Sequence, residues 1–318
     1  MPDNKIKLIS IAGPTASGKT ALSIEIAKKY GGEVISADSM QIYKYMDIAT
    51  AKPTPEEMGR VPHHLIGFVE PGDEYSVAQY VTDASDAIEK VSSVGKLPVL
   101  VGGTGLYIDC LLDGVVFSDA ETDPKLRDKL QDKLDKYGLD YMLSELEKFD
   151  PDSAKRLAPQ RNPKRILRAM EIYYSSGVTM TEQNLRSKSE ESKFDPVMIA
   201  LNYRDREILY SRINRRVDIM IEDGLIEEAR AFYSSCQSNT SNQAIGYKEL
   251  KPYLDGEKTL EECIETLKRS TRRYAKRQLT WFMRNKNIKW FYVDDYKSQD
   301  EFYSAVFRFL SLKGFEFI

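Results

Sequence analysis

The chain has 318 residues, a formal net charge of −3, 42% hydrophobic and 30% charged side chains. This composition is that of a soluble globular protein, long enough for one large domain or two. No apolar run reaches the length of a membrane-spanning helix, so the sequence predicts no membrane association. The net negative charge by itself argues against nucleic-acid binding.

The three cysteines, Cys110, Cys236 and Cys263, are widely spaced and form no C-x-x-C pair. This spacing favours neither a zinc site nor a disulfide framework. The first predicted strand begins within a few residues of Met1 and leaves no room for a signal peptide. We therefore expect a protein of the reducing cytoplasm.

A predicted buried strand over residues 7–12 leads into the pattern G-x-x-x-x-G-K-[ST] and then into an amphipathic helix over 20–29. Glycines let successive backbone N–H groups turn toward one point, and the helix adds its unpaired donors and positive dipole end. Lys19 supplies a mobile charge, and Thr20 a hydroxyl that can ligate Mg²⁺. The pattern predicts a phosphate or diphosphate site made by Gly13, Pro14, Thr15, Ala16, Ser17, Gly18, Lys19 and Thr20.

The second predicted strand, over residues 33–37, runs directly into Asp38. Ligands of open α/β sheets bind beyond the carboxyl ends of the strands, so we expect Asp38 near the phosphates. A carboxylate there can hold Mg²⁺ through water or act as a general base. The alternative is the N-cap of a helix, and the residue alone does not decide between the two.

A turn over residues 51–57 leads into a short helix, and a short strand over 63–67 carries the only histidines, His63 and His64. Adjacent strand residues point to opposite faces, which favours separate hydrogen bonds over a shared metal. A helix over 75–94 and a buried strand over 96–101 precede a second Gly-rich turn. Such a turn lets a ligand approach closely, and its Thr104 either caps the next helix or points into the site.

Strand signals are absent between about residues 123 and 195, where we predict helices over 124–137, 139–149, 163–176 and 179–187. The break in βα alternation indicates an all-helical insertion domain within a core made of residues 1–122 and 196–318. One stretch of this insertion has no acidic residue and six cations: Lys155, Arg156, Arg161, Lys164, Arg165 and Arg168.

The core resumes with a strand over residues 196–201, helices over 205–223 and 225–234, and a loop over 243–248. The longest predicted helix follows over 259–285, then a strand over 289–293 and a helix over 298–313. No acidic residue lies between 268 and 289, and a single helical stripe carries Arg269, Arg272, Arg273, Lys276 and Arg277.

Like charges one turn apart repel each other, so an ordinary solvated helix mixes both signs. Concentrated positive charge instead indicates a phosphate-rich partner, with a solvated cationic face as the alternative. The acid-free cluster in the insertion favours the first interpretation, a bipartite site for a polyanion.

Six segments, in this order, resemble the bacterial tRNA dimethylallyltransferase family, also called tRNA isopentenyltransferases, over essentially the whole chain. They are residues 13–20, 38–43, 102–107, 164–171, 243–248 and 276–282. The first is shared by many nucleotide-binding proteins, whereas the ordered set is specific.

The resemblance implies a P-loop NTPase-like α/β core, with a mostly parallel sheet flanked by helices, and an insertion that grips the tRNA anticodon stem-loop. It implies Mg²⁺ as cofactor and transfer of the dimethylallyl group of dimethylallyl diphosphate to the N6 amine of the adenosine 3′ of the anticodon. The tRNAs concerned are those that read codons beginning with U. The chain carries no Cys/His pairs, so it looks like the form without a zinc finger, and we expect a monomer.

By the same resemblance Asp38 is the general base, acting with Lys19, Thr104 and an arginine that completes a diphosphate clamp, Arg216 or else Arg212. Met283 stands where the family usually has an arginine. The stretches that resemble tRNA-contacting ones contain Asp38, Ser39, Met40, Gln41, Thr104, Arg127, Lys164, Arg165, Ile166, Leu167, Arg168, Gln243, Ala244, Ile245, Gly246, Tyr247, Lys248, Arg272, Arg273, Lys276, Arg277, Gln278, Leu279, Thr280, Trp281, Phe282 and Met283.

Three other functions share part of this pattern. An ATP-dependent small-molecule kinase would use Lys19 and Asp38 but not the basic helix. A prenyltransferase acting on free adenylate would need no RNA surface. A nucleotide-gated RNA-binding protein would have no need of Asp38.

Overall fold

The computed structural model describes residues 5–115, 124–189 and 192–316. The chain divides into two compact units, one of Met1–Leu112 with Lys193–Ile318 and the other of Asp113–Ser192. Among the described residues no helix is both long and apolar enough to cross a membrane.

The first unit is built on a six-stranded parallel sheet in the order β3-β2-β4-β1-β5-β6. All six predicted strands are confirmed, although the one expected over residues 63–67 shortens to two residues. Strand β4 is apolar throughout and mostly buried, as its sequence predicts, whereas β2 is buried along its whole length although it contains Glu33 and Ser36. The strands are β1 (Ile6–Ala12), β2 (Gly32–Ser36), β3 (His63–His64), β4 (Leu97–Val101), β5 (Phe194–Asn202) and β6 (Lys289–Tyr292).

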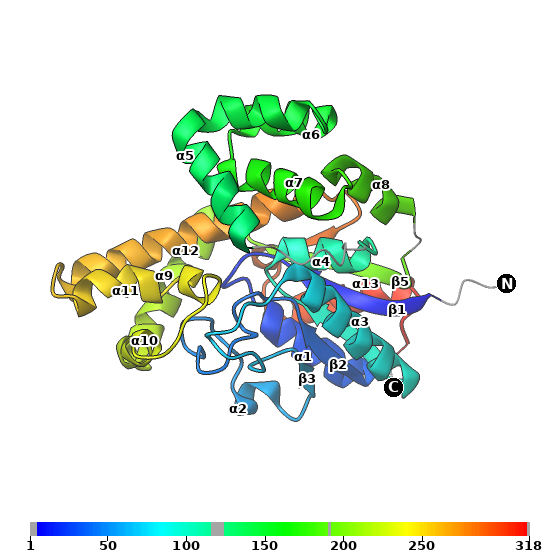
Figure 1. Cartoon of the computed structure of the whole chain (residues 1–318). Coiled ribbons are helices and arrows are strands. Elements are labelled where there is room, and N and C mark those ends of the chain that lie inside the picture. The colour runs from blue at the N-terminus through cyan, green and yellow to red at the C-terminus, as the bar shows by residue number, and fades with distance from the viewer. Residues whose placement is uncertain (1–4, 116–123, 190–191, 317–318) are drawn as a thin grey trace. The chain divides into compact units, whose positions relative to one another are not determined.

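Alternation along β1 divides the core between the two faces of the sheet (Figure 1). Ile9 and Ile11 belong to the cluster that contains residues of α1 (Lys19–Tyr30) and α13 (Gln299–Leu312). Leu8 and Ala12 belong to the cluster on the other face, which includes residues of α3 (Val77–Ser93) and α4 (Gly105–Leu112). This period of two is what a sheet covered by helices on both sides requires.

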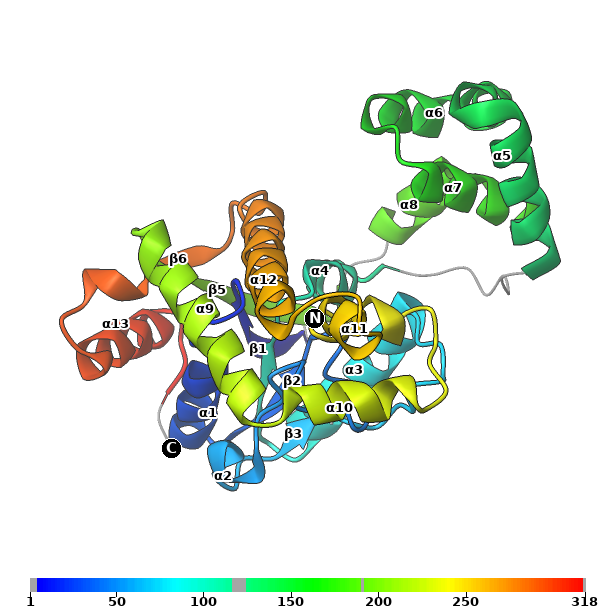
Figure 2. The same cartoon turned by 90° about the vertical axis from the view of Figure 1, so that its left-hand side faces the viewer.

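Helix α12 (Leu260–Phe282) begins at a capping box, in which Thr259 and Glu262 satisfy each other's backbone N–H groups. It contacts α9 (Arg206–Glu222) and α11 (Tyr247–Leu254), and Figure 2 shows it beside both of them and near α10 (Leu225–Tyr233). The predicted loop over 243–248 is wrong at its end, because α11 already begins at Tyr247. The Glu249 side chain, which accepts the N–H of Gly246, provides the cap that starts it.

The second unit is helical throughout its described residues. It has α5 (Pro124–Glu147), α6 (Pro151–Leu157), a 3-10 turn (Ala158–Gln160), α7 (Pro163–Ser176) and α8 (Met180–Ser189) around its own apolar core. Gly138, at φ 80°, breaks α5 where two helices were predicted to meet. Helix α6 was not predicted, although Asp150 caps it and Pro151 occupies its first turn.

His63 and His64 form separate hydrogen bonds, as predicted. His63 Nδ1 lies 2.8 Å from the Val61 carbonyl oxygen, and His64 Nε2 lies 2.6 Å from Glu33 Oε2. The three cysteines are free, with Cys110 and Cys263 buried and Cys236 exposed.

Candidate active site

Three loops meet at one edge of the sheet because they follow β1, β2 and β4, which are neighbours. Two glycines allow close contacts between backbone segments at this edge. A Cβ on Gly13, whose φ is 138°, would lie 2.6 Å from the Leu201 carbonyl oxygen. A Cβ on Gly102 would lie 2.0 Å from the carbonyl oxygen of Ala37, so no other residue fits at this point.

The first loop has the features of an anion cradle. Gly18, in the left-handed conformation, starts α1 without any side-chain cap, which leaves the donors of the first turn to a ligand. The buried Ser17 hydroxyl has no hydrogen-bond partner within the described part of the chain. Lys19 Nζ donates to the Pro14 carbonyl at 2.7 Å. Burial, and next the nearby Arg216, lower the pKa of Lys19 to about 7, while Asp38 opposes this shift.

Helix α9 brings two arginines to the same loop. Arg216 Nη1 donates to Thr15 Oγ1 at 3.2 Å, and Arg212 Nε donates to the Ala16 carbonyl at 3.0 Å. Burial and the charge of Arg212 lower the pKa of Arg216. Because neighbouring cations lower the pKa of Lys19 and of Arg216 beside a helix N-terminus, an anion bound there would be stabilised. Both arginines that were named for the clamp are therefore next to the loop.

Asp38 lies at the end of β2, and its Oδ1 accepts the N–H groups of Met40 at 2.9 Å and Gln41 at 3.4 Å. The residues after it form turns and no helix, so the helix-cap alternative is wrong. Burial raises the pKa of Asp38, and the two backbone bonds and Lys19 oppose that rise. The result is a carboxylate that is positioned by its own loop and can accept a proton.

Thr104 fixes the loop after β2 and does not cap α4. Its Oγ1 accepts the N–H of Ser39 at 2.9 Å and donates to Ser39 Oγ at 3.3 Å, while α4 begins one residue later. Tyr274 of α12 is also in contact with Thr104, and burial raises the pKa of this phenol. Thr104 is thus next to Asp38, as expected, with its hydroxyl occupied by the neighbouring loop.

Gln278 joins the phosphate loop to the Gly-rich turn after β4. Its Oε1 accepts the N–H of Thr15 at 2.9 Å, and its Nε2 donates to the Gly103 carbonyl at 3.0 Å. A Cβ on Gly103 would lie 2.1 Å from this nitrogen. Sequence reasoning placed Gln278 in an RNA-contacting stretch. Its spacing from the buried Ala275 and Phe282 was the signal that it belongs to the inner face of α12.

The three loops enclose a cavity of about 230 Å³ in the first unit. Lys19, Asp38 and Arg216 all line it, so the cationic loop and the carboxylate face the same space. Residues from four further segments that carry the family resemblance also line it: Met40, Gln41, Gly102, Gly103, Gln243, Ala244, Ile245, Gly246, Lys248, Arg277 and Gln278.

The stretches named for tRNA contact separate into exposed and buried side chains. Exposed ones are Arg127, Lys164, Arg165, Arg168, Gln243, Lys248, Arg273, Lys276, Arg277, Thr280 and Met283. Buried ones are Ile166, Leu167, Ala244, Gly246, Tyr247, Gln278 and Phe282, while Ser39, Met40, Gln41, Thr104, Ile245, Arg272, Leu279 and Trp281 are intermediate. The buried side chains support the surface that the exposed ones present.

The cations of α12 remain largely unneutralised. Arg273, Lys276 and Arg277 make no ion pair with any described residue, whereas Lys268 pairs with Asp218 and Glu265. In the second unit, Arg127 and Arg168 both pair with Glu171.

No group of three or more His, Cys, Asp or Glu side chains within the described ranges could enclose a metal by itself. Thr20 and Asp38 nevertheless line one cavity with the phosphate loop. Mg²⁺ commonly takes one or two protein oxygens and completes its shell with water and phosphate oxygens. The residues therefore fit a Mg²⁺ that arrives with a diphosphate.

Fold and site together define an α/β protein in which the Gly-rich loop after β1 and the Asp38 carboxylate face one cavity. The sequence profile of the IPP transferase family matches residues 41–286, and the chain belongs to that family. This confirms the resemblance that the six segments indicate.

Named relatives match over nearly the full length. A tRNA dimethylallyltransferase of Caldanaerobacter subterraneus subsp. tengcongensis is 46% identical, over 97% of this chain and 98% of that protein. One of Halalkalibacterium halodurans is 48% identical over 92% of each. A solved full-length tRNA isopentenylpyrophosphate transferase from Bacillus halodurans is similar with a TM-score of 0.72 and 44% identity, over 97% of both chains. A eukaryotic dimethylallyltransferase acting on tRNA gives a TM-score of 0.74 and 37% identity, over 87% of this chain and 69% of that one.

Proposed function

We propose that this protein transfers the dimethylallyl group of dimethylallyl diphosphate to tRNA and releases diphosphate. The acceptor is the N6 amine of the adenosine 3′ of the anticodon in tRNAs that read codons beginning with U. The observation that carries the proposal is the single cavity lined by Lys19, Arg216 and Asp38. The names of relatives that match the whole chain support the same reaction.

The phosphate loop receives the leaving group. Negative charge develops on the diphosphate as its carbon–oxygen bond breaks, and the loop already directs cations and backbone donors to that place. The negative charge of the diphosphate favours the protonated form of Lys19 and offsets the repulsion between Arg216 and Arg212. Thr20, and Asp38 through a water, would hold a Mg²⁺ ion that would further neutralise the diphosphate.

Asp38 acts on the adenine amine that accepts the dimethylallyl group. The exocyclic amine of adenine is a weak nucleophile because its lone pair is delocalised into the ring. As the nitrogen–carbon bond forms, one amine proton passes to the Asp38 carboxylate, whose raised pKa favours accepting it. The base has to leave its stack to reach the cavity, as in other enzymes that act on a nucleobase.

The tRNA is held by cations that make no ion pair with any described residue. Arg273, Lys276 and Arg277 on α12 form one contact surface, and Lys164 and Arg165 of α7 form a second in the helical unit. Phosphate contacts of this kind fix the anticodon stem-loop but carry little sequence information. We further propose that the protein acts as a monomer in the cytoplasm.

One transfer assay tests this function against its rivals. The protein is incubated with Mg²⁺ and labelled dimethylallyl diphosphate, and separately with bulk tRNA, AMP or ATP as acceptor. We expect label in tRNA alone. Label in AMP or ATP would indicate an adenylate prenyltransferase, and no transfer to any acceptor would contradict prenyl chemistry altogether.

A further inference from the structure

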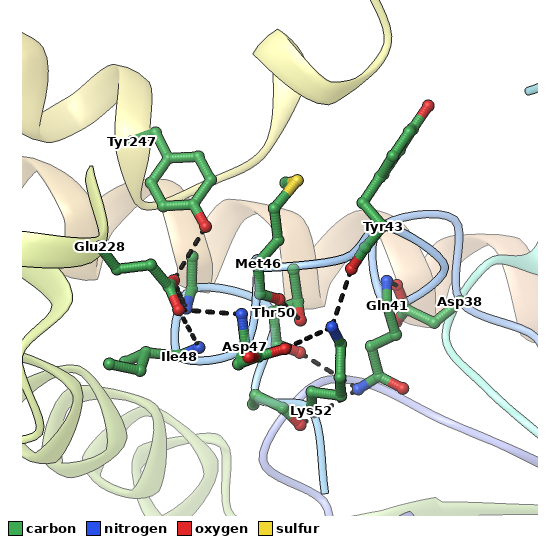
Figure 3. A network of polar contacts seen from close by, with 12 residues as sticks. Asp38, Gln41, Tyr43, Met46, Asp47, Ile48, Thr50, Lys52, Glu228 and Tyr247 are labelled. Carbon is green, nitrogen blue, oxygen red and sulfur yellow. Dashed lines mark hydrogen bonds and ion pairs between the residues drawn. The ribbon is translucent and has the colours of Figure 1, made fainter. Parts of the chain in front are cut away.

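Glu228, in the first turn of α10, fastens two walls of the cavity together (Figure 3). Its Oε2 accepts the N–H groups of Asp47 at 2.9 Å and Ile48 at 2.8 Å. Its Oε1 accepts the N–H of Ala49 at 2.9 Å and the hydroxyl of Tyr247 at 2.8 Å. A carboxylate has about four lone-pair sites, so all the acceptor capacity of this one is used.

The first wall is the irregular segment of residues 47–51, which has no regular secondary structure to satisfy its amides. The carbonyls of Thr50 and Ala51 each accept a hydrogen bond of 3.1 Å from Gln41 Nε2. The backbone N–H of Gln41 in turn donates to Asp38. A continuous set of hydrogen bonds thus leads from Glu228, through this segment and Gln41, to Asp38 (Figure 3).

The second wall is the segment that runs into α11. Tyr247 is fully buried and stacks on Phe232 with ring centroids 4.3 Å apart, which leaves its hydroxyl directed at Glu228. Gly246 lies directly against Ala49, since a Cβ on the glycine would be 3.0 Å from the alanine Cβ. Both residues line the cavity, so the two walls meet there and Glu228 holds them from behind.

We propose that Glu228 is a positioning residue for the nucleobase that accepts the dimethylallyl group. It fixes Gln41 and the two walls beside Asp38 without lining the cavity itself. This inference rests on the proposed function. The phosphate loop is held by other contacts, from Gln278, Arg212 and Arg216. Glu228 therefore controls placement of the nucleobase and leaves binding of the diphosphate unaffected.

The test compares Glu228→Gln with Glu227→Gln. The first variant keeps the shape of the side chain but turns an amide NH₂ toward backbone N–H groups, so donors face donors. The second removes the same charge from an exposed neighbour in the same helical turn. Misplacement of a reacting group by about 1 Å costs about a hundredfold in rate. We expect Glu228→Gln to lower single-turnover prenyl transfer to tRNA by about 10- to 100-fold, with an unchanged KM for dimethylallyl diphosphate.

Tyr247→Phe is the second variant, because it removes one of the four bonds and preserves the buried ring. We expect a several-fold lower rate, again with an unchanged donor KM. Glu228→Gln transferring at the rate of Glu227→Gln would overturn the inference, and so would a raised donor KM. Unchanged transfer by folded Tyr247→Phe would overturn it even if Glu228→Gln failed to fold. Absence of transfer by the wild-type protein would instead contradict the proposed function itself.

Discussion

Lys19 and Asp38 show how one cavity shifts two opposite charges. Burial disfavours the charged form of each, so it lowers the pKa of Lys19 to about 7 and raises that of Asp38. The attraction between the two opposite charges opposes both shifts. The lysine is thus placed to bind an anion, and the carboxylate is placed to accept a proton.

The pKa of Lys19 predicts a pH-dependent affinity for diphosphate. Below about pH 7 the free lysine is protonated and ready to bind, whereas above it binding must be accompanied by proton uptake. We expect the Kd for inorganic diphosphate, measured calorimetrically, to rise as the pH increases from 7 to 9. Lys19→Arg, whose charge is retained over this range, serves as control and gives a flatter profile. A rise of equal size in both proteins would assign the effect to another group.

Asp38→Asn is expected to lower the single-turnover rate by about 10²–10⁴-fold, the usual contribution of a general base. Asparagine keeps an oxygen for the N–H groups of Met40 and Gln41, so the loop retains its shape. Because burial raises the pKa of Asp38, the wild-type rate increases with pH until the carboxylate is ionised. The variant loses this increase. A near-normal rate in the variant would make Asp38 a structural residue only.

Helix α12 has two faces with different roles. Its outer stripe carries cations, and its inner face carries Gln278, which is buried between the phosphate loop and the turn after β4. The same helix therefore adjoins both the proposed diphosphate site and the proposed surface for RNA. This arrangement requires glycine at position 103, because a Cβ there would clash with the Gln278 amide.

Gln278→Leu is expected to weaken the diphosphate site. The substitution leaves the Thr15 N–H and the Gly103 carbonyl without their partner, a loss of about 1–3 kcal/mol for each group left buried. We expect a lower melting temperature and a higher donor KM, with unchanged tRNA affinity in a filter-binding assay. Thr280→Ala, an exposed change on the same helix, is the matched control. Loss of tRNA affinity alone would show instead that Gln278 contacts RNA.

For the whole molecule, the charge distribution matters more than its net value. The chain is negative overall, yet uncompensated cations lie on α12 in one unit and on α7 in the other. Each surface alone is a modest site for a polyanion. We infer that one tRNA engages both, so that binding depends on each.

Reversing charge on either surface is expected to weaken tRNA binding and flatten its dependence on salt. Each lost phosphate contact reduces the slope of log K against log salt by about 0.7 to 0.9. The variants are Arg273→Glu with Lys276→Glu in α12, and Lys164→Glu with Arg165→Glu in α7. Lys90→Glu with Lys313→Glu, both exposed on other elements, is the control. Equal affinity and equal slope in all three proteins would identify the cationic stripes as solvated surface.

Sequence patterns predicted the regular elements best where one residue pattern repeats. The strands and the long helices follow from apolar periodicity, and the phosphate loop follows from its glycines and Lys19. Helix α6 and the start of α11 escaped prediction because each is set by a cap and a few local bonds. The hydrogen bonds of the Thr104 hydroxyl escaped too, because its partner Ser39 is distant in the sequence.

The fold class, the anion cradle and the family follow from the order of the amino acids alone, because they depend on local periodicity and on an ordered set of short motifs. The choice of side chains that share the cavity, and of those that support it, follows only from how the elements pack in the folded chain. Gln278 and Glu228 connect segments more than a hundred residues apart along the chain. Contacts of that kind arise from the crossing of elements in space, and neither residue type nor spacing along the sequence encodes them.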